Sequence, residues 1–247
     1  NGELIRELEG HTASVSSIRF NPKDDSLVSA DQQGGLKLWD SSGNLTYEFG
    51  DNNRSISSMS YSPSGKLFAT GNKNGIINLW NRQGHKIRSF KHHQYPISAI
   101  QFSPSGNQMA AADVNGTVTV WSTRSGRRLN TTAFLGQLTA LVYGETDELI
   151  VIASTEGNIH FWYAPDEKTV STLSLHRSGS AISLDFDRDH NTLLSLGTDG
   201  RLYSWSLDID ELMRSSCSLL KNYLAIDHES LTKKTHQRQS RFCRLAN

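Results

Sequence analysis

The chain has 247 residues, enough to bury a sizeable core as one large all-β domain or two smaller domains. Its 25 basic and 25 acidic side chains balance, so no overall field marks it as a nucleic-acid binder. Neither Cys217 nor Cys243 has a CxxC neighbour, which predicts reduced thiols in a cytoplasmic protein with no zinc site. No apolar run approaches the roughly 20 residues of a membrane span, and no signal peptide opens the chain. The sequence therefore predicts no membrane partner.

The first predicted element, Glu3–Glu9, is a single strand that follows a turn at Asn1-Gly2. The same turn chemistry recurs at Gly43-Asn44 and Gly84-His85, each time just before an outer strand. The chain also begins on Asn1 rather than on a methionine, which favours a piece of a longer protein. We therefore expect residues 3–9 either to complete the last sheet of a small ring or to be the remnant of an earlier sheet.

A repeat of about 40 residues follows, and five tryptophans mark it, spaced by 41, 41, 41 and 43 residues. An aromatic residue lies nineteen positions before each tryptophan, and a glycine lies five positions before it. The glycines are Gly34, Gly75, Gly116, Gly157 and Gly200. Three positions that recur together in five copies establish the repeat.

Each unit has the pattern of four short antiparallel strands joined by turns, with first strands expected near residues 14, 56, 97, 138 and 181. The second strand is a nearly continuous apolar run, such as Met109–Ala112, which is typical of a strand buried on both faces. The periodic glycine follows in a tight turn, where we expect a positive φ. Four strands per 40 residues predict an all-β propeller blade packed on its neighbours.

The segments "GGLKLWD", "GIINLWN" and "GTVTVWS", with Gly10-His11 before the first unit, resemble the tryptophan–aspartate (WD) repeat family over residues 1–206. The resemblance implies a β-propeller, and because most relatives have seven blades, the five blades of this chain are expected to be part of a seven-bladed ring. It also implies a buried tetrad of a histidine, a hydroxyl, an aspartate six residues before the tryptophan, and the tryptophan. The residues that match are His11, Ser29, Trp39, Thr70, Trp80, His93, Trp121, Trp162, Ser195, Asp199 and Trp205.

The tetrad is incomplete in most units of the repeat. The expected aspartate place holds Gln33, Asn74, Asn115 and Glu156 in the first four units. Ala111 replaces the hydroxyl in the third unit. Hydrophobic packing is therefore expected to supply most of the stability.

After Trp205 the pattern changes to a helix expected over residues 207–226, followed by a basic tail over 227–247. The segment 210–224 resembles the C-terminal extension of bacterial, especially cyanobacterial, WD-repeat proteins. Many of these carry a STAND-type signalling NTPase upstream of the propeller. The five cations of residues 233–244 are the one feature that points to nucleic acid, and a solvated tail is the simpler interpretation.

No catalytic motif is present: the sequence contains no GxxxxGK[ST], GxSxG or HExxH segment. His92-His93 lacks the spacing of metal ligands, and Asp185, Asp187 and Asp189 lack the rest of a calcium loop. We therefore predict no enzyme activity, no cofactor and no metal.

The resemblance implies that a protein or peptide partner docks on the loops before the first strands and between the second and third strands. Those loops contain Gln32, Val114, Thr155 and Thr198, and the candidate partner-binding residues are Arg54, Lys73, His92, Tyr95, Gln137 and Arg177. Arg54, Lys73, His92 and Tyr95 are expected to form one basic, aromatic patch. The sequence thus favours a non-catalytic interaction scaffold. The alternatives are the regulatory region of a larger NTPase or protease and a standalone lectin-like ring, but the loop residues do not repeat as such a ring would require.

Overall fold

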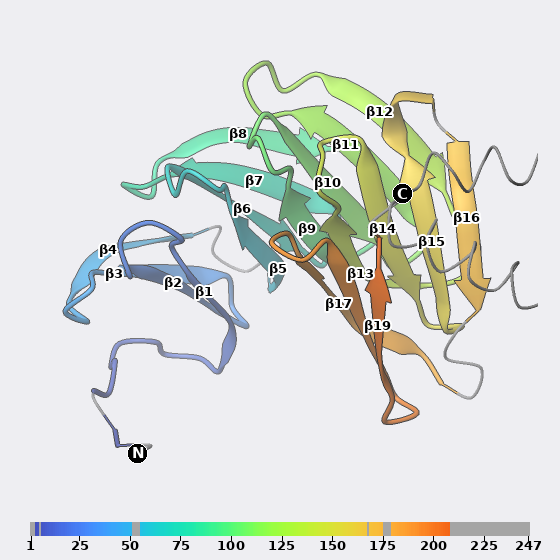
Figure 1. Ribbon diagram of the computed structural model, residues 1–247. Helices are drawn as coiled ribbons and strands as arrows, with labels where there is room; N and C mark the ends of the chain where they lie inside the picture. Colours follow the sequence, from blue (N-terminus) through green and yellow to red (C-terminus); the bar gives the residue numbers. More distant parts are fainter. Residues whose placement is uncertain (1–2, 5, 51–54, 167, 175–178, 208–247) are drawn as a thin grey trace, which may run out of the picture.

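The computed structural model describes residues 3–4, 6–50, 55–166, 168–174 and 179–207. Five antiparallel sheets follow one another around an open arc (Figure 1). The expected helix and tail beyond residue 207, with Arg54 and Arg177, lie outside the described residues. Within the described part the only helical element is a short 3-10 turn, Ala164–Asp166, and no helix is long and apolar enough to cross a membrane.

Each sheet is a meander in which the strands pair in chain order, and we number the sheets as blades 1 to 5. Blade 1 contains β1 (Val15–Phe20), β2 (Leu27–Asp31), β3 (Gly35–Trp39) and β4 (Leu45–Gly50). Blade 2 contains β5 (Ile56–Tyr61), β6 (Leu67–Asn72), β7 (Ile76–Asn81) and β8 (Lys86–Lys91). Blade 3 contains β9 (Ile97–Phe102), β10 (Gln108–Asp113), β11 (Thr117–Ser122) and β12 (Arg128–Ala133). Blade 4 contains β13 (Leu138–Tyr143), β14 (Leu149–Ser154), β15 (Asn158–Tyr163) and β16 (Lys168–Ser174). Blade 5 contains β17 (Ala181–Asp187), β18 (Thr192–Gly197) and β19 (Leu202–Ser206).

The second strands are buried on both faces, as the apolar runs predict. Met109–Ala112 of β10 and Ile150–Ala153 of β14 are all 0% exposed, because neighbouring blades cover the two sides of each sheet. The tryptophans occupy a repeated position between blades. Trp80 packs on Phe49 of the preceding outer strand with ring centroids 5.1 Å apart, and Trp121 packs on Phe90 in the same way at 5.4 Å.

A hydroxyl on the first strand also links blades 1, 2 and 4 to the blade that follows each of them, a feature that the repeat pattern did not predict. Ser57 Oγ donates to the carbonyl of Gly71 in its own blade and to that of Ile97 in the next, at 3.2 and 2.6 Å. Ser16 and Thr139 hold the same place and donate to the first residue of the following inner strand. Blade 5 has the exposed Ile182 at this position.

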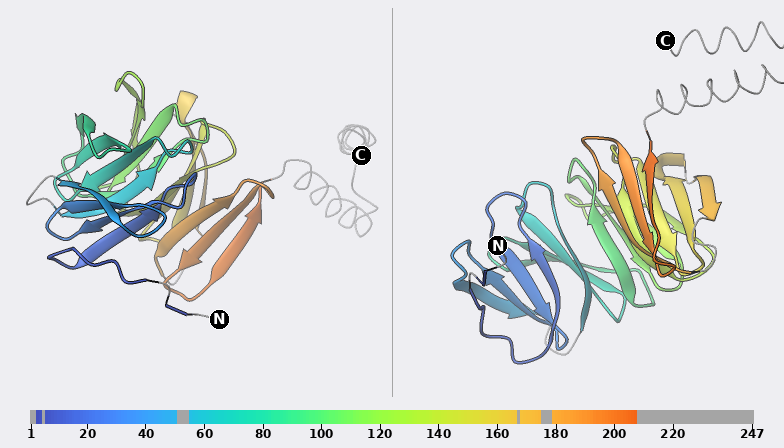
Figure 2. Two further views of the ribbon diagram at one scale, coloured as in Figure 1. Left: turned by 90° about the vertical axis from the view of Figure 1, so that its left-hand side faces the viewer. Right: turned by 60° about the horizontal axis from the view of Figure 1, so that its bottom comes forward.

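The first and last blades each expose a sheet face that the other blades bury (Figure 2). Ile18 and Phe20 of β1 are 49% and 66% exposed, whereas Ile100 and Phe102 at the same repeat positions are 4% and 2% exposed. At the other end of the arc, Leu202 is 65% exposed although its counterparts on the third strands are fully buried. The inter-blade packing surface is therefore uncovered at both ends of the described arc.

The expected strand at residues 3–9 is wrong for the described part of that segment, which forms no strand. Among the described residues no strand pairs with this segment, so the backbone groups of a strand there would lack partners. Arg6 and Leu8 nevertheless lie against Gly43 in the β3–β4 turn. Phe49 makes the same contact with Gly84 in blade 2, and Arg88 makes it with Gly126 in blade 3. The segment thus follows the path of an outer strand in front of blade 1 without pairing.

The periodic glycines all have a positive φ, between 71° and 96°, so that prediction is confirmed. They differ in their surroundings. A Cβ on Gly116 would collide with the carbonyl oxygen of Phe134, whereas a Cβ on Gly200 would meet no atom within 4 Å.

This contrast separates backbone strain from collision. We expect Gly200→Ala to lower the free energy of unfolding by about 1 kcal/mol, the cost of a left-handed alanine. Gly116→Ala adds the displacement of the Phe134 backbone and should cost at least about 1 kcal/mol more. Urea denaturation of both variants measures the difference, and equal losses would contradict the close approach.

Candidate functional site

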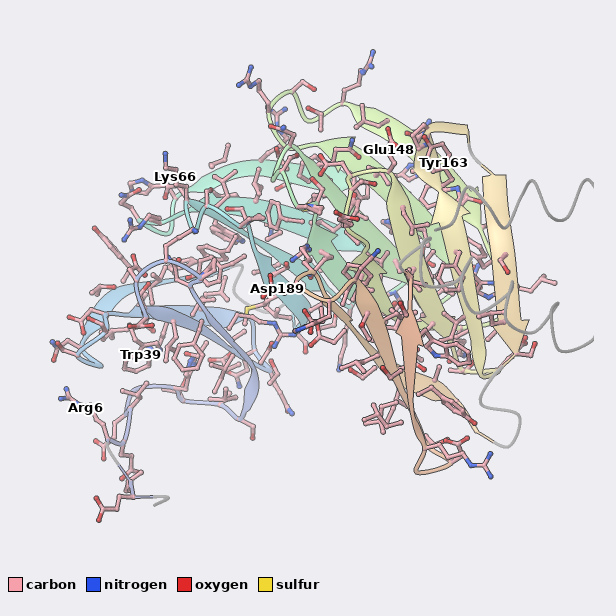
Figure 3. All side chains as sticks on the ribbon, viewed as in Figure 1. Arg6, Trp39, Lys66, Glu148, Tyr163 and Asp189 are labelled. Atoms are coloured by element: carbon pink, nitrogen blue, oxygen red, sulfur yellow. The ribbon has the colours of Figure 1, made fainter. Side chains whose placement is uncertain are left out.

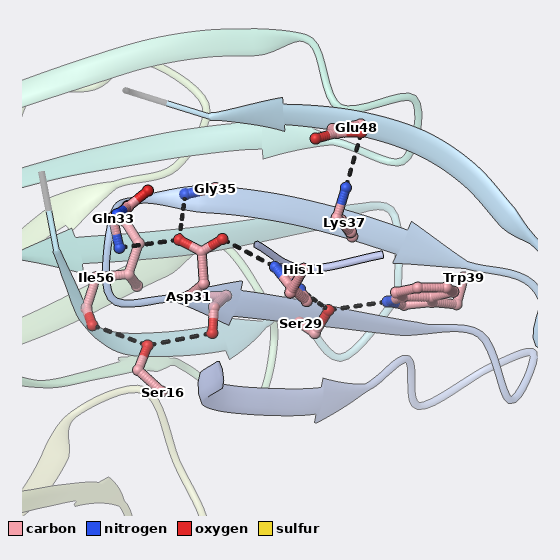
Figure 4. Close-up of polar contacts among 11 residues, drawn as sticks. His11, Ser16, Ser29, Asp31, Gln33, Gly35, Lys37, Trp39, Glu48 and Ile56 are labelled. Atoms are coloured by element: carbon pink, nitrogen blue, oxygen red, sulfur yellow. Dashed lines mark hydrogen bonds and ion pairs between the residues drawn. The ribbon is translucent and has the colours of Figure 1, made fainter. Parts of the chain in front are cut away.

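Hydrogen bonds among His11, Ser29, Asp31 and Trp39, which we call the His11 cluster, connect the loop before blade 1 to the central strands of its sheet (Figure 4). The indole N–H of Trp39 donates to Ser29 Oγ at 2.8 Å, and Ser29 Oγ lies 2.6 Å from His11 Nε2. His11 Nδ1 lies 2.9 Å from Asp31 Oδ2. A neutral His11 with its proton on Nδ1 satisfies the whole chain, because Ser29 then donates to Nε2 and Nδ1 donates to the carboxylate.

The acidic member of this cluster is Asp31, not a residue at the Gln33 position. Asp31 lies eight residues before Trp39, and Asp113 holds the same place before Trp121, with its Oδ2 2.7 Å from His93 Nδ1. The aspartate must stand at the eighth position because its other carboxylate oxygen accepts hydrogen bonds from the backbone N–H groups of the turn. In blade 1 these are the N–H groups of Gln33 and Gly35. Burial alone would raise the pKa of Asp31, but the hydrogen bonds from His11 and these N–H groups outweigh it and lower the pKa.

The other residues at the expected aspartate place lie in turns. Asn74, Asn115 and Glu156 are exposed, and Asp199 accepts a bond from the N–H of Arg201. The eighth position was recognisable from the sequence, because Asp31, Asn72 and Asp113 recur every 41 residues. Asn72 caps its turn through the N–H groups of Asn74 and Ile76.

Blades 2 to 5 retain parts of the cluster. In blade 2, the Trp80 indole N–H donates to Thr70 Oγ1 at 2.9 Å. In blade 3, Ala111 supplies no hydroxyl, and His93 Nε2 is buried without a hydrogen-bond partner among the described residues. Trp162 Nε1 of blade 4 and Trp205 Nε1 of blade 5 are also buried without a hydrogen-bond partner among the described residues. Ser195 of blade 5 is fully buried at the hydroxyl position.

We call the side of the arc formed by the loops before the first strands and the turns between the second and third strands the loop face. It contains a cavity of about 390 Å³ between blades 3 and 4. Tyr95 and Gln137 line it from the loops before β9 and β13, and the β10–β11 turn adds Val114 and Asn115. Tyr95 is 45% exposed, and Leu135 in the adjoining loop is 87% exposed. The cavity therefore offers an aromatic ring and two amides beside a projecting apolar side chain.

Two other candidate residues on this face, Lys73 and His92, have different neighbours. Gly75 in the β6–β7 turn abuts the carbonyls of His93 and Tyr95, which brings the turn containing Lys73 beside the Tyr95 loop. The imidazole of His92 instead lies 3.1 Å from Arg128 Nη1. Burial, reinforced by the charge of Arg128, lowers the pKa of His92 and favours a neutral ring that accepts this bond.

A second cavity of about 270 Å³ lies on the opposite rim between blades 1 and 2. Its lining includes Trp39, Tyr47, Tyr61 and Arg82. Burial raises the pKa of Tyr61 to about 12, so its phenol stays protonated. Among the described residues, no group of three or more His, Cys, Asp or Glu side chains could hold a metal ion.

The expectation of four strands holds for blades 1 to 4, whereas blade 5 has three strands among the described residues. Stacked antiparallel sheets of this kind, with a tryptophan packed on the preceding blade, have the architecture of a β-propeller. The family model for the WD domain, G-beta repeat, matches residues 2–40 and 167–206. Both matches end just after a periodic tryptophan, Trp39 in the first and Trp205 in the second. The model for the Vps42 beta-propeller matches residues 52–148. No curated protein matches the chain. The two matches support a WD-repeat propeller.

The contribution of the cluster's hydroxyl to stability can be tested by removing it from blade 1 and adding one to blade 3. Ser29→Ala leaves His11 Nε2 and the Trp39 indole unpaired and should lower the free energy of unfolding by about 1–3 kcal/mol. Ala111→Ser supplies the missing partner of His93 and should raise it by about 1 kcal/mol. Chemical denaturation reads both changes, and a destabilised Ala111→Ser variant would contradict the assignment of the unpaired nitrogen.

The buried histidine of blade 3 predicts a loss of stability in acid. Burial lowers the pKa of His93 below its ordinary value of 6.5, an effect larger than the opposing bond to Asp113. The unfolded chain therefore binds the proton more readily, so stability is fully present above pH 6.5 and falls as the pH drops below it. His160, whose pKa burial also lowers, contributes with the same sign.

Thermal melting from about pH 8 to about pH 5 checks this dependence. His93→Gln should flatten the decline in Tm. The control His190→Gln should leave the decline in place, because a hydrogen bond to Asp187 raises the pKa of the exposed His190. An unchanged slope in His93→Gln would show that another group causes the acid loss.

Proposed function

We propose that this chain is a non-catalytic protein-interaction module that docks a peptide segment of its partner at the loop-face cavity. WD-repeat propellers generally mediate protein interactions, and this general role supports the proposal. A cytoplasmic setting belongs to the same proposal, because the two cysteines have no motif of a disulfide or zinc framework.

The observation that carries the proposal is the cavity lined by Tyr95, Asn115 and Gln137. Its volume lies near the lower end of the range for ligand pockets, which suits one or two side chains of a peptide. Tyrosine contributes large contact area at low entropic cost and is enriched at interface hot spots. The amides of Asn115 and Gln137 can each donate and accept hydrogen bonds to a peptide backbone.

The alternative is that the chain is the regulatory region of a larger signalling enzyme with an NTPase or protease domain upstream. This alternative rests on the resemblance of residues 210–224, which lie outside the described part of the chain. Both functions use the same docking face, so the binding experiment tests the feature that they share.

Peptides selected from a random display library against the whole chain provide the probe. We expect Tyr95→Ala to weaken the selected peptides by about tenfold or more, as loss of an interface anchor does. Tyr47→Ala is the matched control, because Tyr47 is also 45% exposed but lies on β4 of blade 1. Equal binding by wild type and Tyr95→Ala, measured by fluorescence anisotropy, would refute docking at the cavity.

A further inference from the structure

The balanced total charge conceals an uneven distribution along the chain. Residues 52–144, which include blades 2 and 3, contain ten lysines and arginines but one acidic residue. That residue is Asp113, which is 1% exposed and bonded to His93. Blades 2 and 3 are therefore strongly cationic, and an equal excess of negative charge is spread over the rest of the chain.

Five of these cations come from the outer strands and one outer turn of the two blades. They are Arg88 and Lys91 of β8, Arg124 and Arg127 of the β11–β12 turn, and Arg128 of β12, which together we name the basic surface. All are exposed except Arg88, which is half-buried. Among the described residues, none of the five forms an ion pair with a carboxylate.

Two contacts join the cations of the two blades into one surface. The guanidinium and Cδ of Arg88 lie against Gly126, so this side chain of blade 2 covers the blade 3 turn between Arg124 and Arg127. Arg128 contacts His92, which directly follows Lys91 at the end of β8. Arg88 Nε is also buried without a hydrogen-bond partner among the described residues. The packing therefore holds like charges together, which creates a local positive field.

Acidic side chains border this region on both sides. On the blade 1 side, Asp24 pairs with Arg82 of blade 2. On the blade 4 side, Asp147 accepts bonds from the backbone and hydroxyl of Ser105 in blade 3. Glu148 lies beside it and bonds to Tyr163 (Figure 3). A flat anionic membrane or a long duplex that spans more than two blades would meet these carboxylates, whereas a short acidic segment would not.

We propose that the basic surface docks a short Asp- and Glu-rich segment of a protein partner, separately from the loop-face cavity. Guanidinium groups bind carboxylates through paired hydrogen bonds, and four of the five cations are arginines. Single exposed ion pairs contribute little, so the affinity comes from several pairs formed together in one field.

The test uses the whole chain and a short fluorescent peptide of alternating glutamate and serine, with binding followed by anisotropy at low salt. The peptide should bind wild type, and rising salt should weaken binding because the charges are exposed. Arg124→Glu combined with Arg127→Glu should weaken it by about tenfold. Among the described residues neither side chain forms a hydrogen bond or an ion pair, so the fold should be retained, and circular dichroism checks this.

The matched control is Lys23→Glu combined with Arg188→Glu, which makes the same change in net charge at exposed positions in blades 1 and 5. It should weaken the peptide by less than about twofold. Equal losses in the two double variants would overturn the proposal, because net charge alone would then explain binding. The proposal would also fail if duplex DNA or phosphatidylserine vesicles displaced the peptide from wild type at lower concentration than unlabelled peptide does. Tyr95→Ala should leave this binding unchanged.

Discussion

Each four-stranded sheet of this chain has two apolar faces, and neither can be buried within the blade itself. Packing of one blade on the next is therefore the interaction on which the rest of the structure depends. It explains why β10 and β14 are apolar on both sides and why a tryptophan contacts an aromatic ring of the preceding outer strand in blades 2 and 3. It also explains the exposure of Phe20 and Leu202, whose faces have no neighbouring blade in the described arc.

The polar network supports this packing by fixing the loops that connect the blades. His11 comes from the segment before blade 1 and His93 from the loop between blades 2 and 3, and each is bonded to an aspartate that also caps the β-turn of its own sheet. Loop and turn are thereby joined at one edge of the blade. The candidate cavity lies at this same edge between blades 3 and 4, and its lining includes the loop that follows His93 and the turn that Asp113 caps. The network thus positions the loop face, while the residues that line the cavity there are free to differ from blade to blade.

The sequence predicted the features that depend on periodicity. The strands, the buried second strand and the positive φ of the turn glycines follow from residue spacing, because the same steric problem recurs every 41 residues. It did not place the aspartate correctly. A polar or acidic turn residue six or eight residues before the tryptophan fits the sequence pattern equally well, and only the structure shows which side chain is close enough to bond to the histidine. Residues 3–9 have the composition of a strand, but pairing depends on a neighbour that composition does not reveal. Total charge hid the basic surface, since the cations of blade 2 come beside those of blade 3 only after the two blades pack.

Native-state hydrogen exchange measured by mass spectrometry tests most directly whether inter-blade packing determines stability. If it does, the amides of β10 and β14, covered on both sides, should exchange most slowly. Those of β2 and β18, in the two blades with an uncovered face, should exchange markedly faster. Equal protection of all four second strands would contradict the account, because each blade would then be stable without its neighbours.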